Sequence, residues 1–279
     1  MSSNHVTMRR KGHVVELGLA NPPRHTINAR GSQELYEQLQ ILEKDPSVRV
    51  IVLIGESDGI FVRHYEVGEL ADSSERVIER GHRPKPPRST NAGRVRVEGG
   101  LRGAMRVLES MPQVTIAAIN GMAHGGGLEL ALACDFRLAR EGEFTLGLPE
   151  TGVGILPGGG GTQRLARMIG VARALDLILH GSVLDVETAL ELGIVSRVLP
   201  HSLEEFRTAV DEFAQKLALR APIALAKAKQ AIREGIELPL GEGLRREAEL
   251  FGELMATGDA ARALRAVVDG KPIPPFEGS

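Results

Sequence analysis

Tryptophan is absent from the sequence, and tyrosine, phenylalanine and cysteine are scarce, with two, seven and one residue respectively. Because a single cysteine cannot form an intrachain disulfide, Cys134 fits a reducing compartment, and its apolar surroundings predict a packed core residue. Aromatic residues make up 3% of the chain and the formal net charge is −2. The chain therefore has few aromatic side chains on which bases could stack and no net positive charge to attract phosphates. Neither nucleic acid nor an anionic membrane is an expected partner.

Long apolar runs are also missing. None approaches the ~20 residues that a membrane-spanning helix needs. The N-terminal "MSSNHVTMRRKGHVVEL" has a basic stretch without the apolar run of a signal peptide, so we expect a cytoplasmic protein. No HExxH, GxSxG or cysteine cluster occurs, and the eight histidines are too dispersed to predict a metal site.

Strand-like and helix-like segments alternate in the first part of the 279 residues. Segments 13–20, 48–56 and 114–120 read as strands, with helical patterns between them, which indicates a mainly parallel sheet. We therefore predict an α/β core over residues 1–200 and a helical region over residues 201–279. Residues 71–100 are rich in proline, glycine and arginine. They predict an exposed loop within the core, and a lid over a ligand site is the alternative.

Three consecutive glycines, Gly125, Gly126 and Gly127, follow the strand in "AAINGMAHGGGLELALACD" and precede a helix. Glycines let the backbone approach a ligand closely, and the first N–H groups of the helix have no intrahelical partner. The loop lacks GxGxxG, and neither it nor "PGGGGTQ" supplies the Gly-Lys-Ser/Thr ending of a phosphate loop. An oxyanion hole is the better interpretation.

Two glutamates lie beside these glycine-rich turns. Glu129 sits near the start of the helix, and Glu150 follows Pro149 in "LGLPETGVGILPGGGG", where we expect a loop. Taken alone, each is explained as a capping or surface residue. Together, two carboxylates in one desolvated pocket acquire different pKa values and can serve as an acid and a base.

The two motifs carry a family resemblance. "AAINGMAHGGGLELALACDFRLA" and "LGLPETGVGILPGGGGTQRLARMIG" closely resemble the enoyl-CoA hydratase/isomerase, or crotonase, family, with looser similarity at "NPP", "INA", "VRVIVLIGE" and "DAARALRAVVDGKPIPPF". The resemblance implies an α/β fold, a ClpP-like spiral of ββα units with a C-terminal helical region that supports trimers or dimers of trimers. It also implies an acyl-CoA substrate, with coenzyme A as part of that substrate and no permanently bound cofactor.

The resemblance also implies residue roles. The backbone N–H groups of Tyr65 and Gly126 would form the oxyanion hole, and Glu129 and Glu150 would handle the water and the α-carbon proton. Lys271 would contact the phosphates of coenzyme A, although an ordinary surface lysine explains it equally well. Further substrate-binding residues implied by the motifs are Gly125, Gly127, Pro149 and Gly158.

The chain departs from the family where Phe-x-x-Gly-Ala-Asp is usual, because "FVRHYE" places His64, Tyr65 and Glu66 there. His124 replaces a commonly apolar residue, and His25 lies in the loop that borders the site in relatives. Each histidine alone is explained as a satisfied polar residue in a loop. Together they predict further substrate-binding positions, and a pocket for a more polar acyl group or for a substrate without coenzyme A.

Hydration of a 2-enoyl-CoA is the leading interpretation, because isomerases and hydrolases of the family often keep only one of the two glutamates. A crotonase-fold hydrolase of carbon–carbon bonds in β-dicarbonyl compounds is the first alternative, and a CoA isomerase is another. An RNA-binding or scaffold relative is the least favoured, given the charge and the few aromatic residues.

Overall fold

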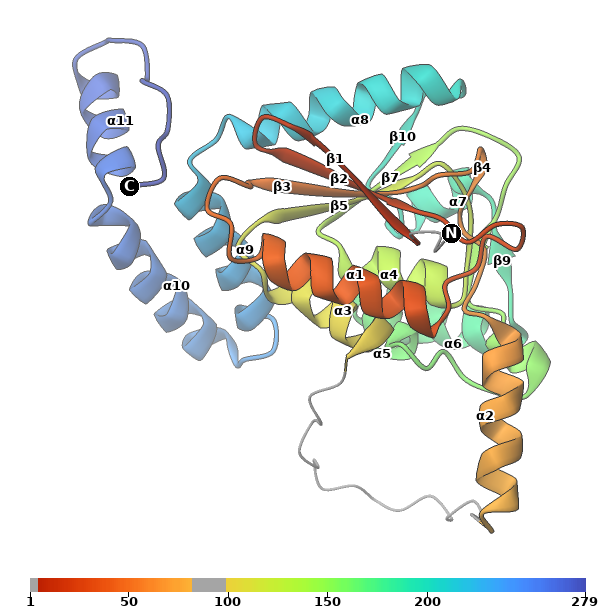
Figure 1. The fold of residues 1–279 in the computed structure, drawn as a ribbon. Coiled ribbons are helices and arrows are strands. Elements are labelled where there is room, and N and C mark those ends of the chain that lie inside the picture. Colours follow the sequence, from red (N-terminus) through yellow and green to blue (C-terminus); the bar gives the residue numbers. More distant parts are fainter. Residues whose placement is uncertain (1–4, 82–98) are drawn as a thin grey trace.

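A six-stranded sheet forms the centre of the computed structural model, which describes residues 5–81 and 99–279 (Figure 1). Only the outermost pair, β1 with β2, is antiparallel, and the remaining neighbours are parallel. The strands β3 and β5 are buried along their whole length, as expected for β-branched strands covered on both faces. In spatial order the strands are β1 (Val6–Lys11), β2 (Val14–Leu19), β3 (Val50–Gly55), β5 (Val114–Ile119), β7 (Phe136–Arg140) and β10 (Arg197–Leu199).

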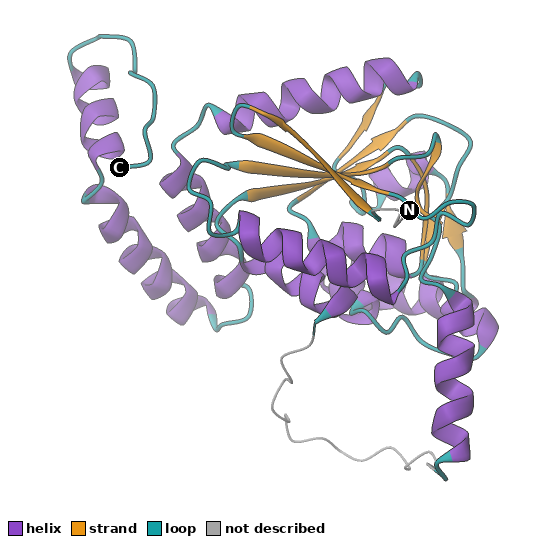
Figure 2. Cartoon of the chain, viewed as in Figure 1, coloured by secondary structure: helices purple, strands orange, loops and turns teal. Residues whose placement is uncertain are grey.

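A second, smaller sheet lies beside the first (Figure 2). Strands of the large sheet continue directly into it, β3 into β4 and β5 into β6, which makes the repeating ββα unit. The side chain of Asn120 fixes this passage, because it accepts from the Gly55 N–H at 2.9 Å and donates to the Ser57 carbonyl at 2.7 Å. In spatial order the strands are β4 (Gly59–Val62), β6 (Gly121–His124), β8 (Leu146–Gly147) and β9 (Val183–Leu184).

Helices cover both faces of the large sheet (Figure 1). On one face, α1, α3 and α4 bury the larger apolar core. On the other face, α8 buries Phe206, Val210 and Ala214 against β3, β5 and neighbouring strands. The helices that complete this body are α1 (Ala29–Leu42), α3 (Gly100–Ser110), α4 (Gly126–Ala133), α5 (Gly161–Ile169), α6 (Val171–His180), α7 (Val186–Glu191) and α8 (Leu203–Ala218), with the 3-10 helix η1 (Glu150–Val153).

The helix α9 (Pro222–Gly235) packs against the main body, where Lys229 Nζ donates to the Leu108 and Gln113 carbonyls. The last two helices, α10 (Leu240–Met255) and α11 (Gly258–Val268), extend away from the sheets (Figure 1). Large apolar side chains on α10 and α11 are exposed, among them Leu240, Phe251 and Val268. No helix in the described residues is both long enough and apolar enough to cross a bilayer.

The prediction of a loop over residues 71–100 is wrong for its first part, because α2 (Val67–Glu79) continues through it. Its apolar residues recur at helical spacing, although none is buried against the core. The expectation of a loop followed the proline, glycine and arginine residues further along the segment, and it overlooked this shorter helical pattern. Residues 82–98 lie outside the described part of the chain. The sequence also did not predict the strand β1. Its "RRK" end is exposed and lacks the apolar alternation of a half-buried strand.

Candidate active site

The turn between β6 and α4 brings the glycines to the site. Gly125 has a left-handed φ of 49°, and a Cβ built on it would lie 2.9 Å from Glu150 Oε1. Glycine is therefore needed there both for the backbone conformation and for the space. The helix α4 that follows is completely buried, so its N-terminal N–H groups open into the interior of the molecule.

Tyr65 lies directly beside Gly126. A Cβ built on Gly126 would stand 3.3 Å from Tyr65 Cβ and 3.5 Å from Tyr65 N. Among the described residues, neither the Tyr65 N–H nor the Gly126 N–H has an acceptor. Burial and a hydrogen bond to Glu69 raise the pKa of Tyr65 to about 12, so its phenol stays neutral and is tied to α2. The structure thus places two free backbone donors side by side.

Glu129 projects from the first turn of α4 and is only 3% exposed. Its Oε1 accepts hydrogen bonds from Gly159 N and Gly161 N, both at 2.8 Å. Burial raises the pKa of Glu129, and the two N–H donors oppose that rise. A Cβ on Gly159 would come within 2.6 Å of Glu129 Oε2, so the glycine-rich loop leaves room for this carboxylate.

Glu150 opens the 3-10 helix η1, where an irregular loop was expected. Its Oε2 is buried and has no hydrogen-bond partner among the described residues. Burial, followed by the negative charge of Glu129, raises the pKa of Glu150 to about 7, opposed by the backbone N–H of Glu150 itself. The two carboxylates therefore lie close enough to affect each other, and one of them titrates near neutral pH.

Two of the predicted histidines border this group. His64 Nδ1 contacts the Tyr65 carbonyl at 2.7 Å, so this nitrogen carries the proton and Nε2 is left as an acceptor in the neutral ring. His64 Cβ lies 3.9 Å from a Cβ built on Gly125. His124 Nε2 contacts Thr145 Oγ1 at 2.8 Å, and burial, then the electrostatic interaction with His64 and Arg63, lower the pKa of His124.

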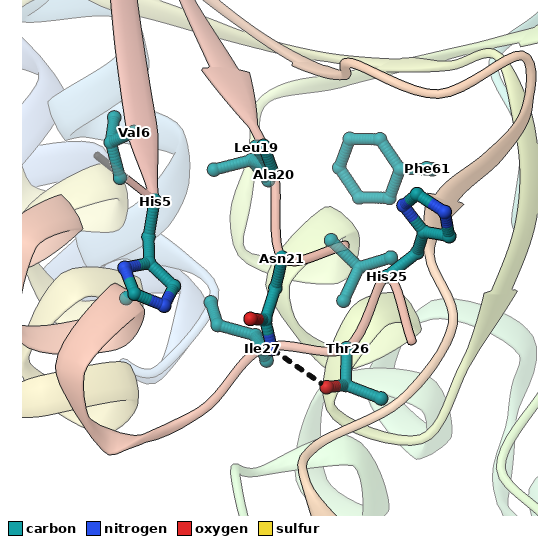
Figure 3. A pocket seen from close by; sticks show the side chains of 11 residues that line it. His5, Val6, Leu19, Ala20, Asn21, His25, Thr26, Ile27 and Phe61 are labelled. Atoms are coloured by element: carbon teal, nitrogen blue, oxygen red, sulfur yellow. Dashed lines mark hydrogen bonds between the residues drawn. The ribbon is translucent and has the colours of Figure 1, made fainter. Parts of the chain in front are cut away.

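His25 lies elsewhere. It lines a small cavity of about 20 Å³ with Asn21, Thr26 and neighbouring residues, to which neither glutamate contributes (Figure 3). The ring Nδ1 of His25 contacts Ser57 Oγ at 2.7 Å. The His25 carbonyl accepts from Arg63 N at 2.9 Å, so His25 lies beside the segment that leads to Tyr65, and its cavity is not lined by the carboxylates.

Three further predicted residues have distinct positions. Pro149 immediately precedes η1, and the carbonyl of Gly158 accepts from Arg102 Nε at 2.9 Å. Lys271 is exposed, pairs with Asp269 at 3.3 Å, and follows α11 at the opposite end of the molecule from α2 (Figure 1). Within one chain, the structure does not bring Lys271 to the other site residues.

Sequence reasoning missed Arg164. Its Nη1 donates to the Gly159 carbonyl at 2.7 Å, and its Nε and Nη2 bind both oxygens of Glu109 at 2.6 and 2.8 Å. Arg164 therefore fixes the peptide loop whose N–H groups hold Glu129. The only signal in the sequence was an arginine three residues after the glycine run. In residues 5–81 and 99–279, no group of three or more histidine, cysteine or acidic side chains could hold a metal ion.

The comparisons with known proteins agree with one another. The family model described as enoyl-CoA hydratase/isomerase matches residues 90–278. The short-chain-enoyl-CoA hydratase of Clostridium acetobutylicum is 32% identical over 282 residues, covering 99% of each chain. The mitochondrial methylglutaconyl-CoA hydratase of Rattus norvegicus is 37% identical over 88% of this chain and 72% of its own. The crystal structure of an enoyl-CoA hydratase from Bacillus anthracis superposes with a TM-score of 0.84 at 32% identity, covering 99% of this chain and 100% of that one.

Proposed function

Since the chain belongs to the enoyl-CoA hydratase/isomerase family, we propose that it adds water across the double bond of a 2-enoyl-CoA thioester. The observation that carries the proposal is the meeting of two carboxylates with two unpartnered backbone N–H groups. Glu129 and Glu150 supply the carboxylates, and Tyr65 and Gly126 supply the donors.

The thioester carbonyl oxygen binds between the Tyr65 and Gly126 N–H groups. Water attacks the β-carbon as Glu129 accepts its proton, and the electrons of the double bond move toward the carbonyl to give an enolate. Preorganised donors aimed at that oxygen stabilise the enolate by about 3 kcal/mol each. Glu150 then protonates the α-carbon, and positioned carboxylates contribute roughly 10²–10⁴-fold to such transfers.

Glu129 is the better base because two N–H groups favour its charged form. Glu150 is the better acid, because its pKa of about 7 keeps it partly protonated at neutral pH and no donor holds its Oε2. On balance the water supplies both the hydroxyl group and the added hydrogen, because the proton that Glu129 accepts replaces, directly or through solvent, the one that Glu150 gives to the α-carbon. The carboxylates and the backbone donors suffice for this sequence, and we propose no resident cofactor. Coenzyme A enters as part of the substrate.

The assembly that we propose is a homotrimer or a dimer of trimers. The exposed apolar side chains of α10 and α11 support it, because such patches usually mark an interface. In such an assembly, Lys271 could reach the coenzyme A phosphates only of a neighbouring copy. The buried, unpaired Cys134 is consistent with a cytoplasmic location.

A second candidate is hydrolysis of a carbon–carbon bond in a β-dicarbonyl compound. His64 favours it, because the ring stands where relatives have a glycine and its Nε2 is available as a base. The same backbone donors would stabilise the enolate that leaves in this reaction.

Calorimetric titration with acetoacetyl-CoA, whose enolate resembles the hydration intermediate, tests the proposal. We expect micromolar binding and, in a second assay, loss of the conjugated-thioester absorbance of crotonyl-CoA. No binding at millimolar ligand, with β-diketone cleavage observed instead, would replace hydration with the second candidate.

A further inference from the structure

The Tyr65 segment is held by a second segment, residues 25–27, through three backbone hydrogen bonds. Arg63 N donates to the His25 carbonyl at 2.9 Å, Ile27 N donates to the His64 carbonyl at 2.9 Å, and Glu66 N donates to the Ile27 carbonyl at 2.8 Å. These bonds lie on both sides of Tyr65 in the chain. The N–H groups of His64 and Tyr65 lie between Arg63 and Glu66 in the chain, and neither donates in these three bonds.

The middle bond sets the direction of that N–H. The His64 carbonyl and the Tyr65 N–H belong to one planar, trans peptide unit, so they point in opposite directions. Because the carbonyl faces Ile27, the N–H faces away from Ile27, and a Cβ built on Gly126 would lie 3.5 Å from this nitrogen. The orientation of the proposed oxyanion donor therefore depends on where residues 25–27 hold Ile27 N.

His25 shapes this supporting segment. Its φ of 53° is the only left-handed value of a non-glycine residue in the described chain. An L-residue rarely adopts this conformation unless its surroundings hold it. The ring is held by Ser57 Oγ at 2.7 Å, and the backbone N–H donates to the Asn21 carbonyl at 2.7 Å. Figure 3 shows His25, Asn21 and Ile27 together around the small cavity.

We propose that His25, anchored by Ser57, is a positioning residue that aims the Tyr65 N–H at the substrate carbonyl. The inference rests on the proposed function, because it assumes that the carbonyl oxygen of an acyl thioester accepts hydrogen bonds from the Tyr65 and Gly126 N–H groups. His25 does not itself contact the reacting atoms. It acts only on the orientation of one peptide unit. The hydrogen bond from that unit stabilises the transition state more than the bound substrate, because the carbonyl oxygen is more negative in the transition state.

Two variants separate the ring from the backbone conformation. Ser57→Ala removes the ring's partner and leaves the backbone intact, whereas His25→Gly removes the ring and keeps φ accessible. The readout is the absorbance of bound cinnamoyl-CoA, whose band moves to longer wavelength when its carbonyl is polarised. We expect a smaller shift in both variants, with kcat for crotonyl-CoA lowered about 10-fold or more and KM changed less than about twofold.

His25→Asn serves as the conservative variant, since asparagine tolerates the left-handed region and can still reach a hydroxyl. We expect it to recover part of the shift and of kcat. The exposed His180→Ala on α6 is the control and should leave both unchanged. A full cinnamoyl-CoA shift and unchanged kcat in both Ser57→Ala and His25→Gly would overturn the positioning role alone. A wild-type protein that neither shifts the chromophore nor hydrates crotonyl-CoA overturns the proposed function, and this role with it.

Discussion

Glu129 and Glu150 are neighbouring carboxylates in opposite hydrogen-bonding environments. One oxygen of Glu129 accepts two backbone N–H groups, whereas one oxygen of Glu150 is buried without a partner. The first arrangement favours a carboxylate and the second favours a carboxylic acid. This asymmetry lets two chemically identical side chains take different parts in one proton-transfer sequence.

Replacing either glutamate with glutamine should abolish most of the hydration activity. The amide keeps the shape of the side chain but cannot exchange a proton, so we expect kcat for crotonyl-CoA to fall about 10³-fold in Glu129→Gln and in Glu150→Gln. Loss of enoyl-thioester absorbance measures the rate, and acetoacetyl-CoA titration checks that the ligand still binds. A fall of less than threefold in either variant would remove that residue from the proposed mechanism.

The pKa of Glu150 predicts a pH dependence of stability. The pKa of the carboxyl is raised to about 7 in the folded protein, from an ordinary value of 4.5. Between these values the native state holds more protons than the unfolded state, so the free energy of unfolding decreases as pH rises through this window. Urea unfolding of wild type and Glu150→Gln from pH 4 to 8 measures this. The variant should lose that part of the slope, and identical slopes would contradict the assignment.

Activity should follow the same titration. If Glu150 is the acid for the α-carbon, the hydration rate decreases as pH rises through about 7. The midpoint belongs to the coupled pair of carboxylates, so both glutamine variants should move or remove it. A kcat profile that is flat from pH 6 to 8 would exclude Glu150 as the rate-determining proton donor.

Gly126→Pro should remove one oxyanion donor without breaking α4, because proline is tolerated at the first position of a helix. We expect affinity for acetoacetyl-CoA and kcat to fall about 10²-fold. Gly126→Ala retains the N–H and is the matched control, although its Cβ would lie 3.3 Å from Leu101 and Tyr65 side-chain atoms. Equal losses in both variants would attribute the effect to space and not to the donor.

His64→Gly distinguishes the two candidate functions. In a hydratase, removing the ring opens space beside Gly125, and we expect kcat/KM for crotonyl-CoA to rise. In a β-dicarbonyl hydrolase that uses His64 as its base, cleavage should instead fall roughly 10²–10⁴-fold. Assays of both substrate classes on the same preparation decide between them.

Asp135→Asn should destabilise the junction between the core and α9. Asp135 pairs with Lys229 at 2.9 Å and with Arg233 at 2.8 Å, and the Lys229 side chain is only 9% exposed. Breaking the pair leaves a buried ammonium without its counter-charge, so we expect about 3 kcal/mol less free energy of unfolding. Asp269→Asn, which breaks the exposed pair with Lys271, should cost less than about 1 kcal/mol in the same urea experiment.

The parts of the site that could be predicted from sequence are the local ones. Gly126 and Glu129 share one turn of α4, so a glycine run followed by a carboxylate was enough to place them together. The Gly159 and Gly161 donors to Glu129 come from 30 and 32 residues further along, and their partnership depends on how α5 packs beside α4. Helix α2 is local too, yet it was missed. None of its residues is buried, and the neighbouring proline, glycine and arginine residues favoured a loop.

The proposed oxyanion donors are both main-chain groups, and this has a consequence for how the protein can diverge. Any side chain except proline at position 65 leaves its N–H in place, so the residues at 64 and 65 are free to vary with the substrate. By contrast, Gly125 and Gly159 face carboxylate oxygens at distances that admit no Cβ. The side chains at 64 and 65 in "FVRHYE" can therefore differ without loss of a main-chain donor, whereas the glycines are required by the space that the carboxylates occupy.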